Sequence, residues 1–149
     1  MLKLPPPVWA LFYLIAAGIV SALYPWRTAL VDLRFLWIGI AITLVGLAVA
    51  FSAANLFRRR GTDIKPTSET NKLLVTDGPF RFTRNPMYLG LTIFTFGIAL
   101  CVGSLPMFAV PIMLFLTVTF VHIPFEEEKM RRQFGPIFDD YTHRVRRWI

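Results

Sequence analysis

The sequence predicts an all-α integral membrane protein with about four transmembrane helices, a cytosolic loop and a C-terminal amphipathic helix. Hydrophobic residues make up 55% of the 149 positions and the mean hydropathy is +0.55, more apolar than is usual for soluble domains. Four uncharged apolar segments approach the ~20 residues that are needed to cross a bilayer. The basic residues lie beside these segments and mainly on one predicted side of the membrane.

The first two predicted spans are residues 8–26 and 35–57, and neither contains a charged residue. Because lipid offers no partners to backbone N–H and C=O groups, apolar segments of this length should be helical. Residues 8–26 are long for the apolar part of a secretory signal and lead into further spans, so we expect an anchor.

The third and fourth predicted spans are residues 87–102 and 105–125. The gap between them is short, so we expect an antiparallel hairpin. Pro111 and Pro124 each remove a helical hydrogen bond, and we expect a kink near Pro124 that redirects the chain. Small residues allow neighbouring membrane helices to approach closely. The candidates in the spans are Gly18, Gly39, Gly46, Gly90 and Gly97.

The distribution of basic residues predicts the side of the membrane on which each loop lies. The formal charge is +7; seven lysines and arginines lie in the loop 58–86, six follow Phe125, and two separate the first two spans. By the positive-inside tendency, the central loop and the tail lie in the cytosol. This topology also accounts for the pI of about 10.2, so we expect no nucleic-acid partner. We expect a single domain, residues 1–149, in the inner membrane of a prokaryotic cell.

Residues 73–90 combine turn-forming residues, Arg81 and Arg84 with the start of a membrane helix. Pro86 suits the first turn of that helix. A helix N-terminus presents unpaired N–H groups, and with the two arginines beside it this setting suits an anionic group. In the alternative interpretation, both arginines extend to lipid headgroups.

Three adjacent carboxylates, Glu126, Glu127 and Glu128, follow the fourth span and repel one another unless they have partners. Glu126 and Glu127 are separated by about 100° around a helix, so both can face one side where cations or hydroxyl groups lie. Alternatively, the carboxylates cap the amphipathic helix 126–134 and pair with its basic residues. The residues alone leave both interpretations open.

Together these segments resemble the isoprenylcysteine carboxyl methyltransferase-like family and its phospholipid methyltransferase relatives. The first similar motif is Gly-Pro-Phe-Arg at 78–81, followed by Arg-Asn-Pro-Met-Tyr-Leu-Gly at 84–90. The second is Glu-Glu at 126–127 with Phe-Gly at 134–135. The resemblance covers roughly residues 51–149. Asn85 stands where many eukaryotic members have histidine, so no acid–base role is assigned to it.

The resemblance implies methyl transfer from S-adenosylmethionine, with S-adenosylhomocysteine as product, to a lipophilic carboxylate, thiol or lipid amine that arrives from the bilayer. The implied cofactor-binding residues are Val75, Gly78, Arg84, Asn85, Pro86, Tyr88, Gly90, Glu126 and Glu127. Arg81 and Arg84 are the catalytic candidates. Arg144 and Arg147 are the candidates for binding an anionic acceptor.

Two other functions remain open: an NADPH-dependent membrane reductase of the sterol reductase kind and a non-catalytic membrane protein. An amine acceptor would require a base, for which His122 and His143 are candidates, although an isolated histidine is more often packed or solvated. Cys101 is the only cysteine, so no thiol cluster is available for a metal. The absence of a Gly-x-Gly-x-x-Gly motif excludes a soluble Rossmann methyltransferase. The acceptor and the oligomeric state stay open.

Overall fold

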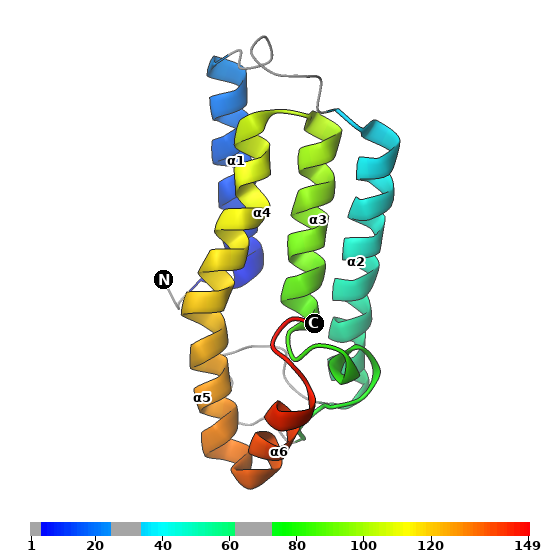
Figure 1. Cartoon of the computed structure of the whole chain (residues 1–149), viewed down its shortest axis with the longest axis vertical. Coiled ribbons are helices and arrows are strands. Elements are labelled where there is room, and N and C mark those ends of the chain that lie inside the picture. Colours follow the sequence, from blue (N-terminus) through cyan, green and yellow to red (C-terminus); the bar gives the residue numbers. More distant parts are fainter. Residues whose placement is uncertain (1–3, 25–33, 62–72) are drawn as a thin grey trace.

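The computed structural model describes residues 4–24, 34–61 and 73–149, all of whose regular elements are helical. Residues 25–26 of the first predicted span and residues 62–72 of the central loop lie outside these ranges. Four long helices lie side by side: α1 (Pro6–Leu23), α2 (Leu36–Arg59), α3 (Pro86–Val102) and α4 (Leu105–Thr117). As Figure 1 shows, α3 lies between α2 and α4, and α1 lies against α4.

The helix lengths agree with the predicted membrane protein. Within the described ranges, three helices are long and apolar enough to cross a membrane: Pro6–Leu23, Leu36–Arg59 and Leu105–Phe134. The remaining predicted span, α3, is a shorter apolar helix of 17 residues. The expected hairpin is present, because α3 and α4 pack together and Gly103 turns the chain between them with a φ of 69°.

Glycines bring α2 and α3 into backbone contact. A Cβ added at Gly46 would lie 2.4 Å from the backbone nitrogen of Phe94, and one added at Gly90 would lie 2.5 Å from that of Ala50. Gly39 and Gly97 have similarly close neighbours in the facing helix. The expected close approach is therefore confirmed for four of the five glycines. The expectation is wrong for Gly18, because a Cβ added there would have no neighbour within 4 Å.

The helix is not interrupted at Pro124. A π-helical turn, η3 (Val118–His122), joins α4 directly to α5 (Ile123–Phe134), so the helix continues from Leu105 to Phe134 (Figure 1). Pro124 lies in the first turn of α5, immediately after this wider turn, where the loss of one N–H is tolerated. The chain reverses instead at Gly135, with a φ of 53°, before α6 (Pro136–Arg144).

Two apolar clusters hold the parts of this bundle together. The first joins α1, α3 and α4, where the Tyr13 hydroxyl lies 2.8 Å from that of Thr117. The second contains Ala53, Val75 and Phe80, and it holds the segment before α3, including the 3₁₀ helix η2 (Gly78–Arg81), against α2. The loop that leads into α3 is thereby fixed at one end of the bundle.

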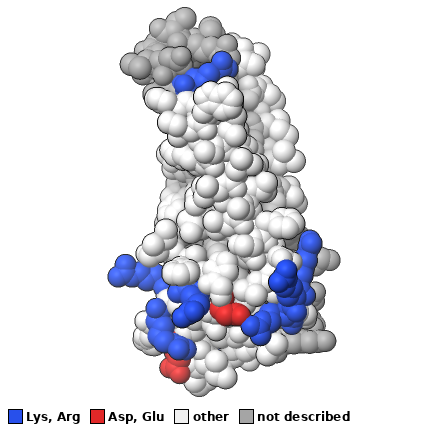
Figure 2. Space-filling view, turned by 90° about the vertical axis from the view of Figure 1, so that its right-hand side faces the viewer, with Lys and Arg blue, Asp and Glu red and all other residues white. Residues whose placement is uncertain are grey.

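Charge and apolar surface are separated along the bundle. On the face in Figure 2, most arginines and lysines gather at one end, and a broad uncharged band covers the helices above them. Many large apolar side chains of α1 and α2 are exposed, including Phe12, Ile15 and Phe51. Such a surface is expected where helices face lipid rather than water.

Candidate functional site

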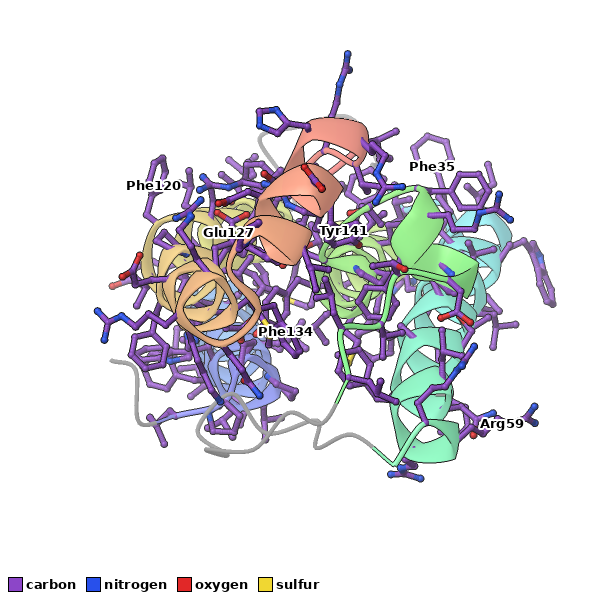
Figure 3. All side chains as sticks on the ribbon, turned by 90° about the horizontal axis from the view of Figure 1, so that it is seen from below. Phe35, Arg59, Phe120, Glu127, Phe134 and Tyr141 are labelled. Atoms are coloured by element: carbon purple, nitrogen blue, oxygen red, sulfur yellow. The ribbon has the colours of Figure 1, made fainter. Side chains whose placement is uncertain are left out.

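The two segments singled out by the sequence meet at the charged end of the bundle. The loop before α3 contacts α2, while α5 projects beyond the apolar part of its helix. Figures 1 and 3 show α6 between α5 and this loop, with Glu127 and Tyr141 near the centre of the group. The Tyr141 hydroxyl donates to the Phe80 carbonyl at 2.7 Å, so α6 is attached to the loop. Burial raises the pKa of Tyr141 to about 12, which keeps this donor protonated.

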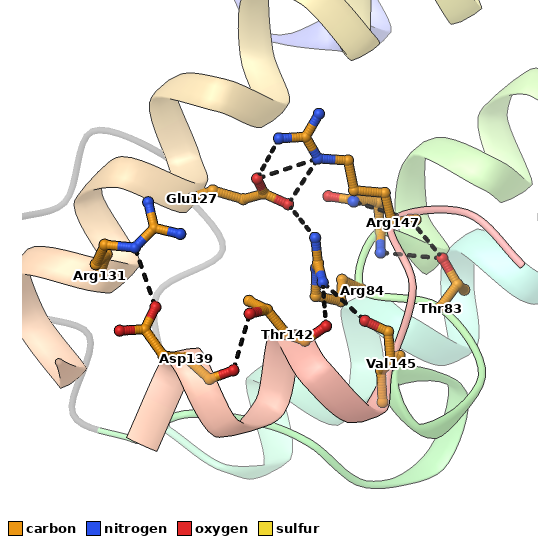
Figure 4. A network of polar contacts seen from close by, with 9 residues as sticks. Thr83, Arg84, Glu127, Arg131, Asp139, Thr142, Val145 and Arg147 are labelled. Atoms are coloured by element: carbon orange, nitrogen blue, oxygen red, sulfur yellow. Dashed lines mark hydrogen bonds and ion pairs between the residues drawn. The ribbon is translucent and has the colours of Figure 1, made fainter. Parts of the chain in front are cut away.

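Glu127 lies between two guanidinium groups (Figure 4). Arg84 donates from Nη2 to Glu127 Oε1 at 2.7 Å. Arg147 donates from Nη2 to Oε2 at 2.6 Å and from Nε to both carboxylate oxygens at 3.0 and 3.1 Å. The side chains of Arg84 and Glu127 are only 12% and 13% exposed, whereas that of Arg147 is 44% exposed. The hydrogen bonds to Glu127 raise the pKa of Arg147, so the pair is ionised.

Arg84 also binds the C-terminal end of α6. Its Nη1 donates to the carbonyl oxygens of Thr142 at 3.0 Å and Val145 at 2.7 Å. Carbonyls at a helix C-terminus lack partners within the helix and carry partial negative charge, so a cation is stabilising there. Its Nε is buried and has no hydrogen-bond partner among the described residues. Arg84 therefore points into the protein and does not extend to lipid headgroups.

Glu126 faces the start of α3. It accepts a hydrogen bond from the hydroxyl of Tyr88, which lies in the first turn of that helix. Both carboxylates thus face one side, as the first interpretation of the acidic cluster expects. Only Glu128 follows the alternative, because it is half exposed and pairs with Arg131 and Arg132 of its own helix.

The structure brings together some of the predicted site residues and leaves others apart. Those that meet are Arg84, Asn85, Tyr88, Glu126, Glu127 and Arg147. Arg81 is exposed and forms no hydrogen bond or ion pair with any described residue. The Arg144 side chain is also exposed and, among the residues that the structure describes, donates only to the Asp140 carbonyl, at 3.3 Å. Neither of these two arginines belongs to the Glu127 network.

Four other predicted residues have structural surroundings of their own. Val75 is buried in the apolar cluster on α2, and Gly90 faces α2 at its closest approach. Pro86 is buried in the first turn of α3, and Gly78 begins η2 with a φ of 58°, which favours glycine. These four positions shape the backbone around the carboxylates, and none of their side chains offers a polar group.

Sequence reasoning missed three residues of this region. Thr83 donates to the Arg147 carbonyl at 2.9 Å, and Thr142 supplies one of the carbonyls that Arg84 binds. Trp148 stacks on Phe115 with ring centroids 4.6 Å apart. The contacts of Thr83 and Thr142 involve backbone carbonyls, which carry no sequence signal. A tryptophan such as Trp148 is common near a membrane interface, so its type alone does not indicate a site.

An apolar groove of about 480 Å³ lies between α3 and α4. Its lining residues are Thr92, Ile93, Phe96, Phe108, Pro111, Ile112 and Phe115. At one end, the Thr92 hydroxyl donates to the Tyr88 carbonyl at 2.9 Å, and Phe115 contacts Trp148. The groove therefore ends one helical turn from the Tyr88–Glu126 pair.

Comparison with known proteins identifies the family. A family model described as phospholipid methyltransferase matches residues 34–137, a range that includes α2 to α5 and both Arg84 and Glu127. No curated protein and no solved structure matches the chain. Within the described ranges, no three His, Cys, Asp or Glu side chains are grouped so that they could hold a metal ion. The match confirms the resemblance of the two motifs, and the chain belongs to the phospholipid methyltransferase family of integral membrane methyltransferases.

Proposed function

We propose that the protein transfers the methyl group of S-adenosylmethionine to a lipophilic acceptor at the charged, cytosolic end of the bundle. The family supplies the reaction class. The observation that carries the proposal is the meeting of Glu126 and Glu127 with Arg84 and Tyr88, from two motifs about 40 positions apart, at the first turn of α3. The gathering of basic residues at this end supports its cytosolic orientation.

The polar groups of the site fit the parts of this cofactor. When bound, S-adenosylmethionine supplies a methyl group on a sulfonium centre, together with ribose hydroxyls, an amino group and a carboxylate. Glu126 and Glu127 offer oxygen acceptors to the hydroxyls or the amino group, and the buried Nε of Arg84 is a donor without a partner among the described residues. Displacement at a sulfonium requires alignment and exclusion of water more than acid–base groups. A site whose two carboxylates are already held by Tyr88 and Arg84 provides such alignment.

The groove between α3 and α4 supports an acceptor with an acyl or similar apolar chain. Apart from the Thr92 hydroxyl, which is bonded within its own helix, the lining is apolar, and it ends beside the carboxylates. A chain in this groove would place its headgroup at the level of Tyr88. The family description favours a phospholipid over a free carboxylate or thiol. Arg81 and Arg144, both exposed and outside the Glu127 network, are candidates to attract an anionic headgroup.

Equilibrium binding to the purified protein in lipid nanodiscs tests this function. We expect the wild type to bind S-adenosylhomocysteine and not NADPH. Glu127→Gln should weaken binding by about tenfold or more, because a charge-assisted hydrogen bond is lost. Glu128→Gln is the matched control, since it removes the same charge from an exposed neighbour, and its affinity should stay within about twofold of wild type.

The same preparations, given methyl-labelled S-adenosylmethionine and a bacterial lipid extract, test transfer. Label should appear in the lipid phase with the wild type and with Glu128→Gln, and should fall sharply with Glu127→Gln. Tight NADPH binding without S-adenosylhomocysteine binding would instead favour the reductase. Binding of neither cofactor, together with intact behaviour of Glu127→Gln, would favour a non-catalytic role.

A further inference from the structure

The C-terminal tail, residues 145–149, lies across the site and is held there by its backbone. The Arg84 N–H donates to the Arg146 carbonyl at 3.0 Å. The Thr83 hydroxyl and the Asn85 side-chain amide both donate to the Arg147 carbonyl, at 2.9 and 3.0 Å. Three consecutive loop residues thus fix the position from which the Arg147 side chain reaches Glu127.

Arg147 fills the remaining hydrogen-bonding capacity of Glu127. A carboxylate offers about four lone-pair sites. Glu127 accepts one N–H group of Arg84 and two of Arg147, whose Nε–H is shared between the two carboxylate oxygens, so each oxygen has two contacts. A ribose hydroxyl or an amino group must therefore compete with Arg147 for Glu127.

The docked tail also leaves buried donors unsatisfied. Trp148 Nε1 and Arg84 Nε are both buried, and neither has a hydrogen-bond partner in the described part of the chain. Unpaired buried donors cost free energy, and an ion pair whose arginine is nearly half exposed contributes little. This cost opposes the hydrogen bonds that hold the tail, and an arrangement that gave these donors partners would remove it.

We propose that the tail is a latch, and that cofactor binding displaces Arg147 from Glu127. This inference rests on the proposed function. The latch joins both halves of the site, because Arg147 binds the Glu127 carboxylate while Trp148 covers Phe115 at the end of the apolar groove. Release of the tail would open both the Glu127 site and the end of the groove.

Binding of S-adenosylhomocysteine to Arg147→Ala tests the latch. This ligand has no net charge, so removal of a positive residue has little direct effect on it. Arg146→Ala is the matched control, because that side chain is exposed and pairs with no described residue. We expect Arg147→Ala to bind S-adenosylhomocysteine roughly fivefold tighter than wild type, because a larger fraction of the protein has Glu127 free to bind the ligand. The affinity of Arg146→Ala for S-adenosylhomocysteine should stay within about twofold of that of wild type.

Unchanged or weaker binding by Arg147→Ala would overturn the latch, because Arg147 would then be neutral or part of the cofactor pocket. Failure of all three proteins to bind would instead overturn the proposed function. Trypsin gives a second measurement, since it cleaves after Arg146 and Arg147. Mass spectrometry of the wild type should show faster loss of the tail when S-adenosylhomocysteine is present. Protection of the tail by the ligand would indicate a lid that closes over the cofactor and would contradict the latch.

Discussion

Arg84 is the residue on which the charged end depends most. One guanidinium group binds Glu127 of α5 and two carbonyls at the end of α6, while the backbone N–H of the same residue binds the tail. The planar fork of an arginine carries its donors on separate nitrogens and so reaches acceptors on two sides, whereas the three donors of a lysine all start from one nitrogen. Arg84 therefore joins the loop, α5, α6 and the tail.

We expect Arg84→Lys to lower the free energy of unfolding by about 2–4 kcal/mol, because acceptors that are largely buried lose their donors. Arg81→Lys makes the same substitution at an exposed position and should change stability by less than about 0.5 kcal/mol. Unfolding in mixed micelles, followed by circular dichroism, measures both. Equal effects of the two substitutions would contradict the role given to Arg84.

Single residues also show what the sequence can predict and what it cannot. The direction of Glu126 and Glu127 follows from their helical spacing, and the structure agrees. Val75 and Gly90 belong to the predicted cofactor site, yet they face α2, because such a segment contains packing positions as well as contact positions. The docking of the tail rests on backbone carbonyls, which every residue has, so no pattern of side chains could have indicated it.

At the level of elements, the site depends on two junctions between helices. The contact of α2 with α3 fixes the position along the bundle of the loop that carries Arg84. This contact requires glycine where the two helices lie closest. The π-helical turn lets α4 continue into α5, so Glu126 and Glu127 lie on the same uninterrupted helix. The sequence predicts the first junction from its small residues. It does not predict the π-helical turn of the second, because such a turn has no sequence pattern of its own.

Substitution of glycines tests how much the close contact of α2 with α3 contributes to stability. Gly46→Ala places a Cβ against the backbone of α3 and should destabilise the protein by about 1–3 kcal/mol. Gly18→Ala introduces the same group into open space in another membrane helix, and it should be neutral or slightly stabilising. The midpoint of unfolding by sodium dodecyl sulfate compares them. A loss of stability in Gly18→Ala as large as that in Gly46→Ala would show that the close approach of α2 and α3 does not matter.

At the level of the whole molecule, the helices differ in length. The continuous helix Leu105–Phe134 has 30 residues and is about 45 Å long, whereas α3 has 17 residues and is about 26 Å long. The hydrocarbon core of a typical bilayer is about 30 Å thick. The long helix can therefore cross it and still hold its carboxylates beyond the apolar region, but α3 alone falls short.

The shortness of α3 creates a hydrophobic mismatch on one side of the protein. Lipids beside α3 should compress to meet it, which draws the headgroup layer toward Tyr88 and Asn85. We expect methyl transfer to be fastest in bilayers of short-chain lipids and to fall severalfold as the acyl chains lengthen, with S-adenosylhomocysteine binding less affected. Proteoliposomes of graded chain length measure this, and rates independent of thickness would contradict it. Local thinning would thus bring an acceptor headgroup down to the reacting centre without any movement of the membrane helices.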